Sequence, residues 1–273
     1  MEIFYYGVVF MFGAIIGSFL NVVLYRLHTG KSLNGRSHCM TCGTTLSWYE
    51  LFPIFSYVTL RGKCRTCAAR IPSRYLLVEL SMGLSYVGLW YLFAGNFILL
   101  ALYFTLISIL MLIVVYDLRH TIIPDELTLM VGGVVVALIG YEYMLNHDVL
   151  LILSRMGAGL GAAFFFWGLW YMSKGRWIGF GDAKLALPLG ALVGLGNIFS
   201  MVVFSFWIGA GVSLLLLGAQ KLLKRGKTNL RFLSTPITMK SEVPFAPFLI
   251  LGFIAVHFLH ADIFDITYTF LFP

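Results

Sequence analysis

The chain has 273 residues, of which 60% are hydrophobic and 11% are charged, and its formal net charge is +7. Soluble globular domains carry about 25% charged residues, so this composition excludes an ordinary soluble domain and indicates a membrane protein. Because the apolar segments are unbroken runs and not alternating stretches of about ten residues, a transmembrane β-barrel is excluded as well.

Apolar runs follow one another along most of the chain and predict an all-α polytopic membrane protein. A helix needs about 20 mostly apolar residues to cross the hydrocarbon core. The runs that meet this requirement are 3–25, 75–94, 97–116, 127–145, 149–172, 197–219 and 245–261, and a shorter run covers 183–195. We therefore expect about eight transmembrane helices.

The first run is expected to be a transmembrane helix and not a secretory signal. No basic region precedes it, since the chain begins Met1-Glu2, and no convincing cleavage site of small residues follows it. Gly13 and Gly17 stand four positions apart, a spacing that lets two helices approach closely. We interpret these glycines as packing residues.

The basic residues predict how the chain is oriented in the membrane. If the runs cross alternately, all of the 19 Lys and Arg residues except Arg155 fall on one side. The positive-inside rule makes that side cytoplasmic and places both termini outside. The net charge then reflects topology, so we expect no nucleic-acid partner. The basic segment 221–231 is expected to contact anionic membrane lipid.

The four cysteines all lie in the polar segment between the first two long runs, as Cys39-x2-Cys42 and Cys64-x2-Cys67. Two such pairs predict a tetrahedral Zn²⁺ site, and a cytosolic segment disfavours stable disulfides. A redox pair and unpaired thiols remain alternatives. Four thiolates leave no open position on the metal, so we expect structural zinc. The predicted division is a first helix (1–26), a zinc-binding domain (27–73) and a helix bundle (74–273).

Two acidic residues near the cytoplasmic ends of runs suggest catalysis. A carboxylate at the bilayer centre costs about 2.5 to 3.5 kcal/mol, so acids near spans need an explanation. Asp117 follows run 97–116, and Asp182 precedes run 183–195. If these helices pack together, the two carboxyl groups face each other. Facing carboxyl groups that share one proton are the apparatus of aspartic proteases.

Asp182 also has a purely structural interpretation. In the segment Gly179-Phe180-Gly181-Asp182 it precedes a helix, and Asp is a favoured N-cap residue. Taken alone, this interpretation is the better one. For a catalytic Asp182, Gly179 and Gly181 would supply positive φ angles and room for a substrate backbone.

Two further acids are expected to support the fold or the site. Asp125 follows Pro124 and precedes a helical run, so we expect it to cap that helix. Glu79 lies early in run 75–94 and is expected to pair with a basic residue such as Arg74 or Arg26, or to help line the site.

Four segments, taken in order, resemble the type IV prepilin peptidase family: 13–26, 47–67, 117–128 and 179–194; segment 244–249 fits as well. The resemblance implies a membrane aspartic endopeptidase of the G-x-G-D type, with Asp117 and Asp182 as its catalytic residues. Its substrates would be type IV prepilins or pseudopilins, cut after a positively charged leader at the cytoplasmic face of the bacterial inner membrane. One departure is Leu51-Phe52-Pro53, where many members have Asn before Ile-Pro.

The resemblance also implies N-methylation of the new N-terminus with S-adenosylmethionine, as in many members of the family. The sequence contains no glycine-rich dinucleotide fingerprint that would place this methyl donor. The cysteine segment and the adjoining membrane surface are candidates by proximity alone. The sequence does not indicate an oligomeric state.

Two other function classes are alternatives. Acids in membrane spans also mark the ion paths of transporters and channels. Here the acids gather near one face, and the two halves of the chain show no inverted repeat, which argues against that class. An intramembrane protease with another substrate class, such as signal peptides, is disfavoured by the predicted zinc segment.

Overall fold

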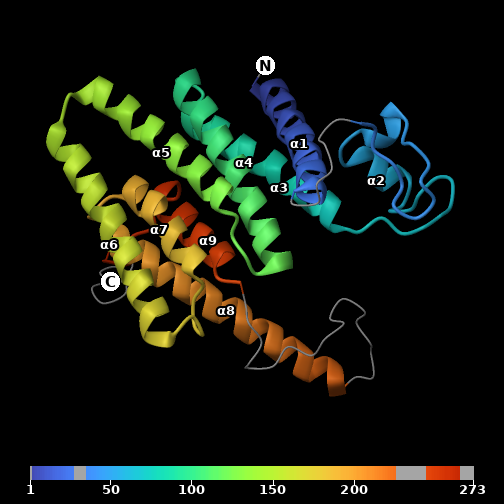
Figure 1. The fold of residues 1–273 in the computed structure, drawn as a ribbon. Coiled ribbons are helices and arrows are strands. Elements are labelled where there is room, and N and C mark those ends of the chain that lie inside the picture. The colour runs from blue at the N-terminus through green and yellow to red at the C-terminus, as the bar shows by residue number, and fades with distance from the viewer. Residues whose placement is uncertain (1, 28–34, 226–243, 265–273) are drawn as a thin grey trace, which may run out of the picture. The chain divides into compact units, whose positions relative to one another are not determined.

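Figure 1 shows the computed structural model of the chain, which describes residues 2–27, 35–225 and 244–264. Helices make up the regular structure of these residues, together with two isolated β-bridges. Within these described residues, six helices are long and apolar enough to cross a membrane. They are α1 (Glu2–Arg26), α3 (Arg74–Phe93), α4 (Phe97–His120), α5 (Asp125–Asn146), α6 (Val149–Ser173) and α8 (Ile198–Arg225).

The predicted all-α membrane fold is confirmed, and each of the predicted runs contains a helix. Two of these helices are short: α7 (Phe180–Val193) has 14 residues and α9 (Ala246–His257) has 12. Both fall below the roughly 20 residues that a perpendicular span needs. Most of the basic segment 221–231, predicted to contact lipid, lies outside the described residues.

The chain divides into two compact units, Met1–Val115 and Tyr116–Pro273, and each is described by itself. In the first unit, α1 ends at Arg26 and α3 begins at Arg74. These positions match the ends of the predicted zinc-binding domain, although the three-part division of the chain stays a prediction. Between them lie a short 3-10 helix, η1 (Trp48–Leu51), and α2 (Phe55–Thr59). We call residues 35–73 the cysteine module.

In the first unit α1 and α3 pack closely through glycines, as the spacing of Gly13 and Gly17 predicts. A Cβ atom on Gly13 would lie 2.7 Å from the Met82 carbonyl oxygen, and one on Gly17 would lie 2.9 Å from Glu79 Cα. Both distances are shorter than real Cβ contacts. The helices therefore touch backbone to backbone, which holds Glu79 beside α1.

Gly13→Ala is expected to destabilise the first unit by about 1–3 kcal/mol, because the new methyl group forces the two helix backbones apart. Gly7→Ala is the matched control on the same helix, since nothing lies within 4 Å of a Cβ there. This control is expected to be neutral or slightly stabilising, because Ala is the better helix former. Denaturant titration in detergent would compare them. Equal stability of the two variants would contradict the close packing.

The second unit is organised around α7. This helix contacts α5, α6, α8 and α9, and it lies between α6 and α9 in Figure 1. A Cβ on Gly159 of α6 would lie 2.6 Å from the Leu187 carbonyl oxygen, so α6 and α7 also touch backbone to backbone. Most α7 side chains are buried, including Leu185 and Leu189. The surroundings of α7 are thus protein on most sides, which suits a short helix with a carboxyl group in its first turn.

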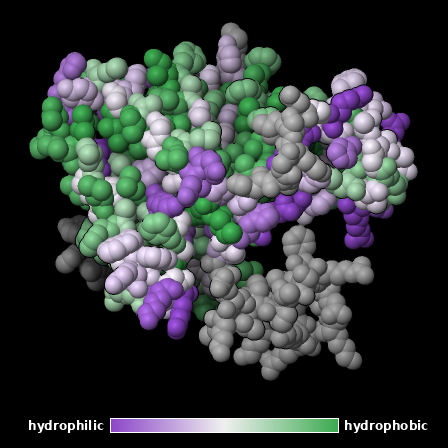
Figure 2. Space-filling model, in the orientation of Figure 1, coloured by the Kyte–Doolittle hydropathy of each residue, from purple (hydrophilic) through white to green (hydrophobic). Residues whose placement is uncertain are grey.

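The outer helices of the second unit present apolar side chains to their surroundings. Leu150 and Phe164 of α6 are 73% and 70% exposed. Figure 2 shows mostly apolar side chains over α5 and α6 on the visible face. Exposed apolar helices of this length are typical of surfaces that contact lipid.

Candidate active site and metal centre

The two aspartates predicted as a pair lie together in the second unit. Asp117 is in the last turn of α4 and Asp182 is in the first turn of α7, and they are only 3% and 5% exposed. Their carboxyl groups are close enough for the charge of Asp117 to act on Asp182. Two buried carboxyl groups from the ends of separate helices thus lie close to each other.

Each of these carboxyl groups is held by one backbone N–H group. Gly179 N donates to Asp182 Oδ2 over 3.0 Å, and the N–H of Ala246, the first residue of α9, donates to Asp117. The other oxygens, Asp117 Oδ2 and Asp182 Oδ1, have no hydrogen-bond partner and are the only buried side-chain oxygens or nitrogens of the described residues in that condition. Buried polar atoms are normally paired, so these two oxygens mark a place for a proton, a water or a substrate group.

The structure changes the expected roles of the residues just before Asp182. The N-cap of α7 is Gly179, and Asp182 is the third residue of the helix, from which it bonds back to the Gly179 N–H. The expected positive φ angles are wrong: φ is −73° at Gly179, and Gly181 lies inside the helix. What matters at Gly181 is size, because a Cβ there would lie 3.0 Å from the Cβ of Ile123.

The four cysteines of the module converge. Their sulfur atoms all lie within 4.8 Å of one another, and Cys39 Sγ is 3.8 Å from Cys67 Sγ. A tetrahedral Zn²⁺ with Zn–S bonds of about 2.3 Å requires sulfurs about 3.8 Å apart. All four are free cysteines. The sulfurs therefore fit one tetrahedral metal ion, and a disulfide, with sulfurs about 2 Å apart, does not describe them.

Both Cys-x2-Cys segments fold into the same turn. The carbonyl of the first cysteine accepts a hydrogen bond over 2.9 Å from the N–H four residues on, which belongs to Gly43 in one turn and Ala68 in the other. Both residues have positive φ, 71° and 55°. The bridges His38–Thr45 and Lys63–Arg70 close the two turns. The matching geometry aims two thiols of each segment at a common point.

Local hydrogen bonds favour the thiolate form that a metal needs. Backbone N–H groups of the turns lower the pKa of the Cys39 and Cys64 thiols. The Thr44 side chain lowers the pKa of Cys42, which it contacts over 3.3 Å. The turns thus prepare three of the four cysteines to act as ligands. The pKa of the fourth, Cys67, is raised to about 12 by burial and by the neighbouring thiols of Cys42, Cys64 and Cys39.

Comparison with known proteins shows the family to which this chain belongs. Residues 11–93 match the family model described as Bacterial Peptidase A24 N-terminal domain, and residues 104–214 match the one described as Type IV leader peptidase family. A Vibrio cholerae protein named prepilin leader peptidase/N-methyltransferase is 31% identical over 239 residues, which is 78% of this chain and 89% of that relative. The chain belongs to the type IV leader peptidase family.

Other relatives in the family carry the same name. One from Burkholderia pseudomallei (strain 1026b) is 33% identical over 271 residues, covering 88% of this chain and 81% of its own length. One from Myxococcus xanthus is 34% identical over 215 residues, covering 76% of this chain but only 62% of its own length. No solved structure matches the chain. The leader peptidase match contains both Asp117 and Asp182.

Glu79 makes contacts other than the expected ion pair with Arg74. It is buried, and Glu79 Oε2 accepts a hydrogen bond over 2.7 Å from the N–H of Ile54, which precedes α2. The Ser18 hydroxyl of α1 is its other partner. The expected pairing with Arg74 is wrong, because the Arg74 guanidinium lies over the Tyr75 ring. Glu79 therefore fastens the cysteine module to α1 and α3.

The expectation that Asp125 caps the following helix is also wrong. The N-cap of α5 is Pro124, and Asp125, the first residue of the helix, makes no capping hydrogen bond. Its Oδ1 instead lies 2.7 Å from Lys184 Nζ in the first turns of α7. This ion pair joins the start of α5 to the start of α7. Sequence reasoning missed Lys184, and no local pattern marks it.

Asp125→Asn is expected to lower prepilin cleavage less than tenfold. The pair is exposed, with side-chain exposures of 37% for Lys184 and 65% for Asp125. Exposed ion pairs contribute about 0–1 kcal/mol. The measurement is kcat/KM in reconstituted membranes. A loss of a thousandfold or more would contradict this expectation and would indicate a direct role for Asp125 in cleavage.

Proposed function

We propose that this chain is a membrane-embedded aspartic endopeptidase. It removes the positively charged leader of type IV prepilins or pseudopilins at the cytoplasmic face of the bacterial inner membrane and methylates the new N-terminal amine with S-adenosylmethionine. The names of its relatives support both activities. The observation that carries the cleavage reaction is the buried pair Asp117 and Asp182, with one unpartnered oxygen on each carboxyl group.

In the proposed reaction the two carboxyl groups share one proton and hold a water between Asp117 Oδ2 and Asp182 Oδ1. The ionised group takes a proton from the water, whose oxygen attacks the scissile carbonyl carbon, while the other group donates its proton to the carbonyl oxygen. The tetrahedral intermediate then collapses. The C–N bond breaks, and the leaving amine takes the proton that came from the water.

The backbone hydrogen bonds hold each aspartate in position to bind and activate the water. The Gly179 N–H directs one oxygen of Asp182 away, so Oδ1 is left for the water. The Ala246 N–H does the same for Asp117 from the start of α9. In this proposal Gly181 positions Asp182 by letting α7 pack against Ile123, and Gly179 is the glycine that leaves room for substrate.

The metal belongs to the cysteine module and not to bond cleavage. Cys39, Cys42, Cys64 and Cys67 would hold Zn²⁺ with four thiolates, a closed set without a position for a reacting water. Bound zinc would supply folding free energy to a small polar segment with little core of its own. Two ends of this segment are fixed without metal, through α1 and α3.

The cytoplasmic placement of the module and the aspartates rests on the distribution of Lys and Arg. The substrate fits this orientation, because a prepilin leader is basic and stays on the cytoplasmic side. Labelling of single cysteines introduced into a cysteine-free background would report the sidedness directly.

The proposal is tested by incubating the purified, membrane-reconstituted protein with a prepilin and isotope-labelled S-adenosylmethionine. Mass spectrometry is expected to show a new N-terminus after the leader that carries one labelled methyl group. A prepilin whose junction residue is replaced is the control. Failure of the wild-type protein to cut would contradict the proposed function, and cutting without methylation would remove its second half.

A further inference from the structure

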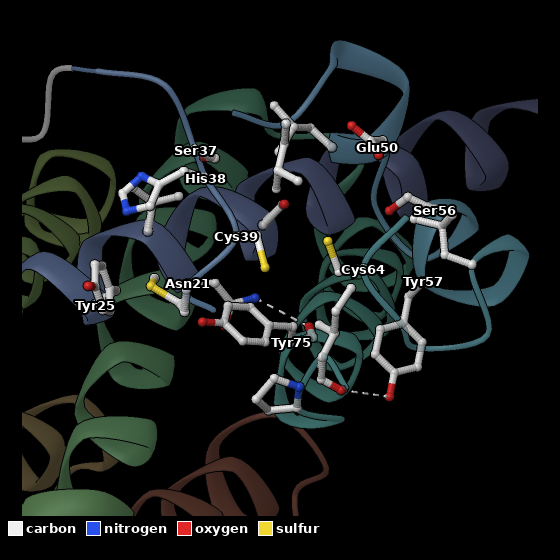
Figure 3. Close-up of a pocket in the computed structure, with 18 of the residues that line it drawn as sticks. Asn21, Tyr25, Ser37, His38, Cys39, Glu50, Ser56, Tyr57, Cys64 and Tyr75 are labelled. Atoms are coloured by element: carbon white, nitrogen blue, oxygen red, sulfur yellow. Dashed lines mark hydrogen bonds between the residues drawn. The ribbon is translucent and has the colours of Figure 1, made fainter. Parts of the chain in front are cut away.

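The first unit contains a cavity of about 230 Å³ between α1, α3 and the cysteine module. We call it the module cavity. Figure 3 shows Asn21 and Tyr25 of α1, Tyr75 of α3 and Ser56 and Tyr57 of α2 around it. Sites for small molecules occupy roughly 300–1,000 Å³, so this space lies just below that range and would enclose most, but not all, of one small molecule. It is too small for a leader peptide of several residues.

Hydrogen bonds hold the walls of the module cavity in place. Asn21 Nδ2 donates to the Tyr75 carbonyl over 3.3 Å, and the Tyr57 hydroxyl donates to the Ile71 carbonyl over 3.4 Å, both drawn in Figure 3. The bond from Ile54 N to Glu79, one of the lining residues, joins module to helix. The cavity is therefore preformed, which lowers the cost of ordering it around a ligand.

The lining combines three kinds of group. The rings of Tyr25, Tyr57 and Tyr75 offer flat apolar surface. Two carboxylates, from Glu50 and Glu79, offer negatively charged hydrogen-bond acceptors. Cations line it as well: Arg26, Arg65 and Arg70.

We infer that the module cavity binds S-adenosylmethionine, an inference that rests on the proposed methylation. The donor combines a flat adenine, a ribose with two hydroxyl groups, a sulfonium cation and an amino-acid end that carries both charges. Tyrosine rings accommodate adenine by stacking and attract a sulfonium through their faces. The carboxylate of the amino-acid end matches an arginine.

Glu50 is the residue we assign to the ribose hydroxyls. One of its oxygens, Oε2, already accepts from the Ser47 N–H over 2.8 Å, which fixes the side chain at the start of η1. A carboxylate accepts about four hydrogen bonds, so acceptor sites remain for a diol. Glu79 is committed to Ile54 and Ser18 and serves to shape the floor.

The module cavity also explains why a cysteine cluster belongs to a methylating enzyme. Cys39 and Cys64, one from each pair, line the cavity, and Figure 3 shows their sulfurs facing the same interior. A metal that joins the two turns would therefore set the shape of one cavity wall. Donor affinity is then coupled to zinc occupancy.

The test uses the full-length, zinc-loaded protein in lipid nanodiscs. Calorimetric titration with S-adenosylmethionine and S-adenosylhomocysteine is compared for the wild type, Ser56→Trp and Val58→Trp. Both positions lie on α2, but Ser56 lines the cavity while Val58 is 62% exposed and does not. We expect Ser56→Trp to weaken binding at least tenfold with zinc content retained, and Val58→Trp to change it less than twofold. Equal binding by the two variants overturns the site.

A second measurement needs no substitution. Ultraviolet crosslinking of radiolabelled S-adenosylmethionine to the wild-type protein, followed by peptide mapping, is expected to place the label within residues 18–79. Label confined to other peptides, in protein that still methylates prepilin, overturns the site and leaves the proposed function standing. Protein that cuts prepilin but neither binds nor uses the donor overturns the site together with the methylation half of the proposed function.

Discussion

Asp182→Asn is expected to reduce prepilin cleavage at least a thousandfold while the protein still inserts and folds. General acid–base groups contribute about 10²–10⁴-fold, and asparagine can neither take a proton from water nor share one with Asp117. Asn keeps an acceptor oxygen for the Gly179 N–H, so the start of α7 should survive the change. Asp117→Asn is expected to have an effect of the same size, because the pair acts together.

Asp148→Asn is the matched control for these variants. Asp148 belongs to the same unit but lies at the opposite end of α5, where it caps α6 by accepting from the Leu150 N–H over 2.9 Å. Asn is an equally good cap, so stability and cleavage should stay unchanged. The measurement is single-turnover cleavage in reconstituted membranes with enzyme in excess. Retained activity in either Asp117→Asn or Asp182→Asn would remove that residue from the pair.

Cys64→Ser is expected to abolish stoichiometric zinc binding and to unfold the cysteine module. Cys64 is the buried member of the four, so a water molecule cannot easily take the place of its sulfur as a metal ligand. Structural zinc contributes about 10–16 kcal/mol of folding free energy in small domains, so its loss is expected to unfold the module. Metal analysis and limited proteolysis are the measurements, with new cuts expected between residues 35 and 73.

Thr66→Ser is the control for Cys64→Ser, because it lies in the same turn and keeps the backbone N–H that faces Cys64. It should bind zinc and resist protease like the wild type. As a chelator removes zinc, the methylation activity should be lost before the cleavage activity, since the aspartates lie in the other unit. Two results together would contradict the structural role of zinc: wild-type protein that is isolated without zinc, and a Cys64→Ser variant that is no more sensitive to protease than the wild type.

Features with a local signature were predictable from the sequence. Each predicted apolar run contains a helix, because the need to satisfy backbone hydrogen bonds within lipid leaves few other structures. The cysteine cluster was predictable from spacing, since two Cys-x2-Cys turns present their thiols in only a few ways. For Asp117 and Asp182, the sequence placed both on the cytoplasmic side of their runs, and their proximity was predicted only on the condition that the two helices pack together.

Features that depend on contacts between distant segments were not predictable. Nothing in the vicinity of Glu79 indicates that Ile54 will be its partner, and charge alone favoured Arg74. The pair Asp125–Lys184 and the N–H of Ala246 at Asp117 likewise depend on how α4, α5, α7 and α9 pack. The role of Gly181 was missed for the same reason, because Ile123 is its neighbour only in the folded chain.

The central claim is that Asp117 and Asp182 act as one catalytic unit, and the double variant tests it most directly. Residues that act as a unit show strongly non-additive losses, because removing the second adds little once the first is gone. We predict that Asp117→Asn/Asp182→Asn cuts a prepilin at the same residual rate as each single variant, within about threefold. Losses that multiply, or a single variant that retains activity, would show that the two carboxyl groups work independently and would contradict the account.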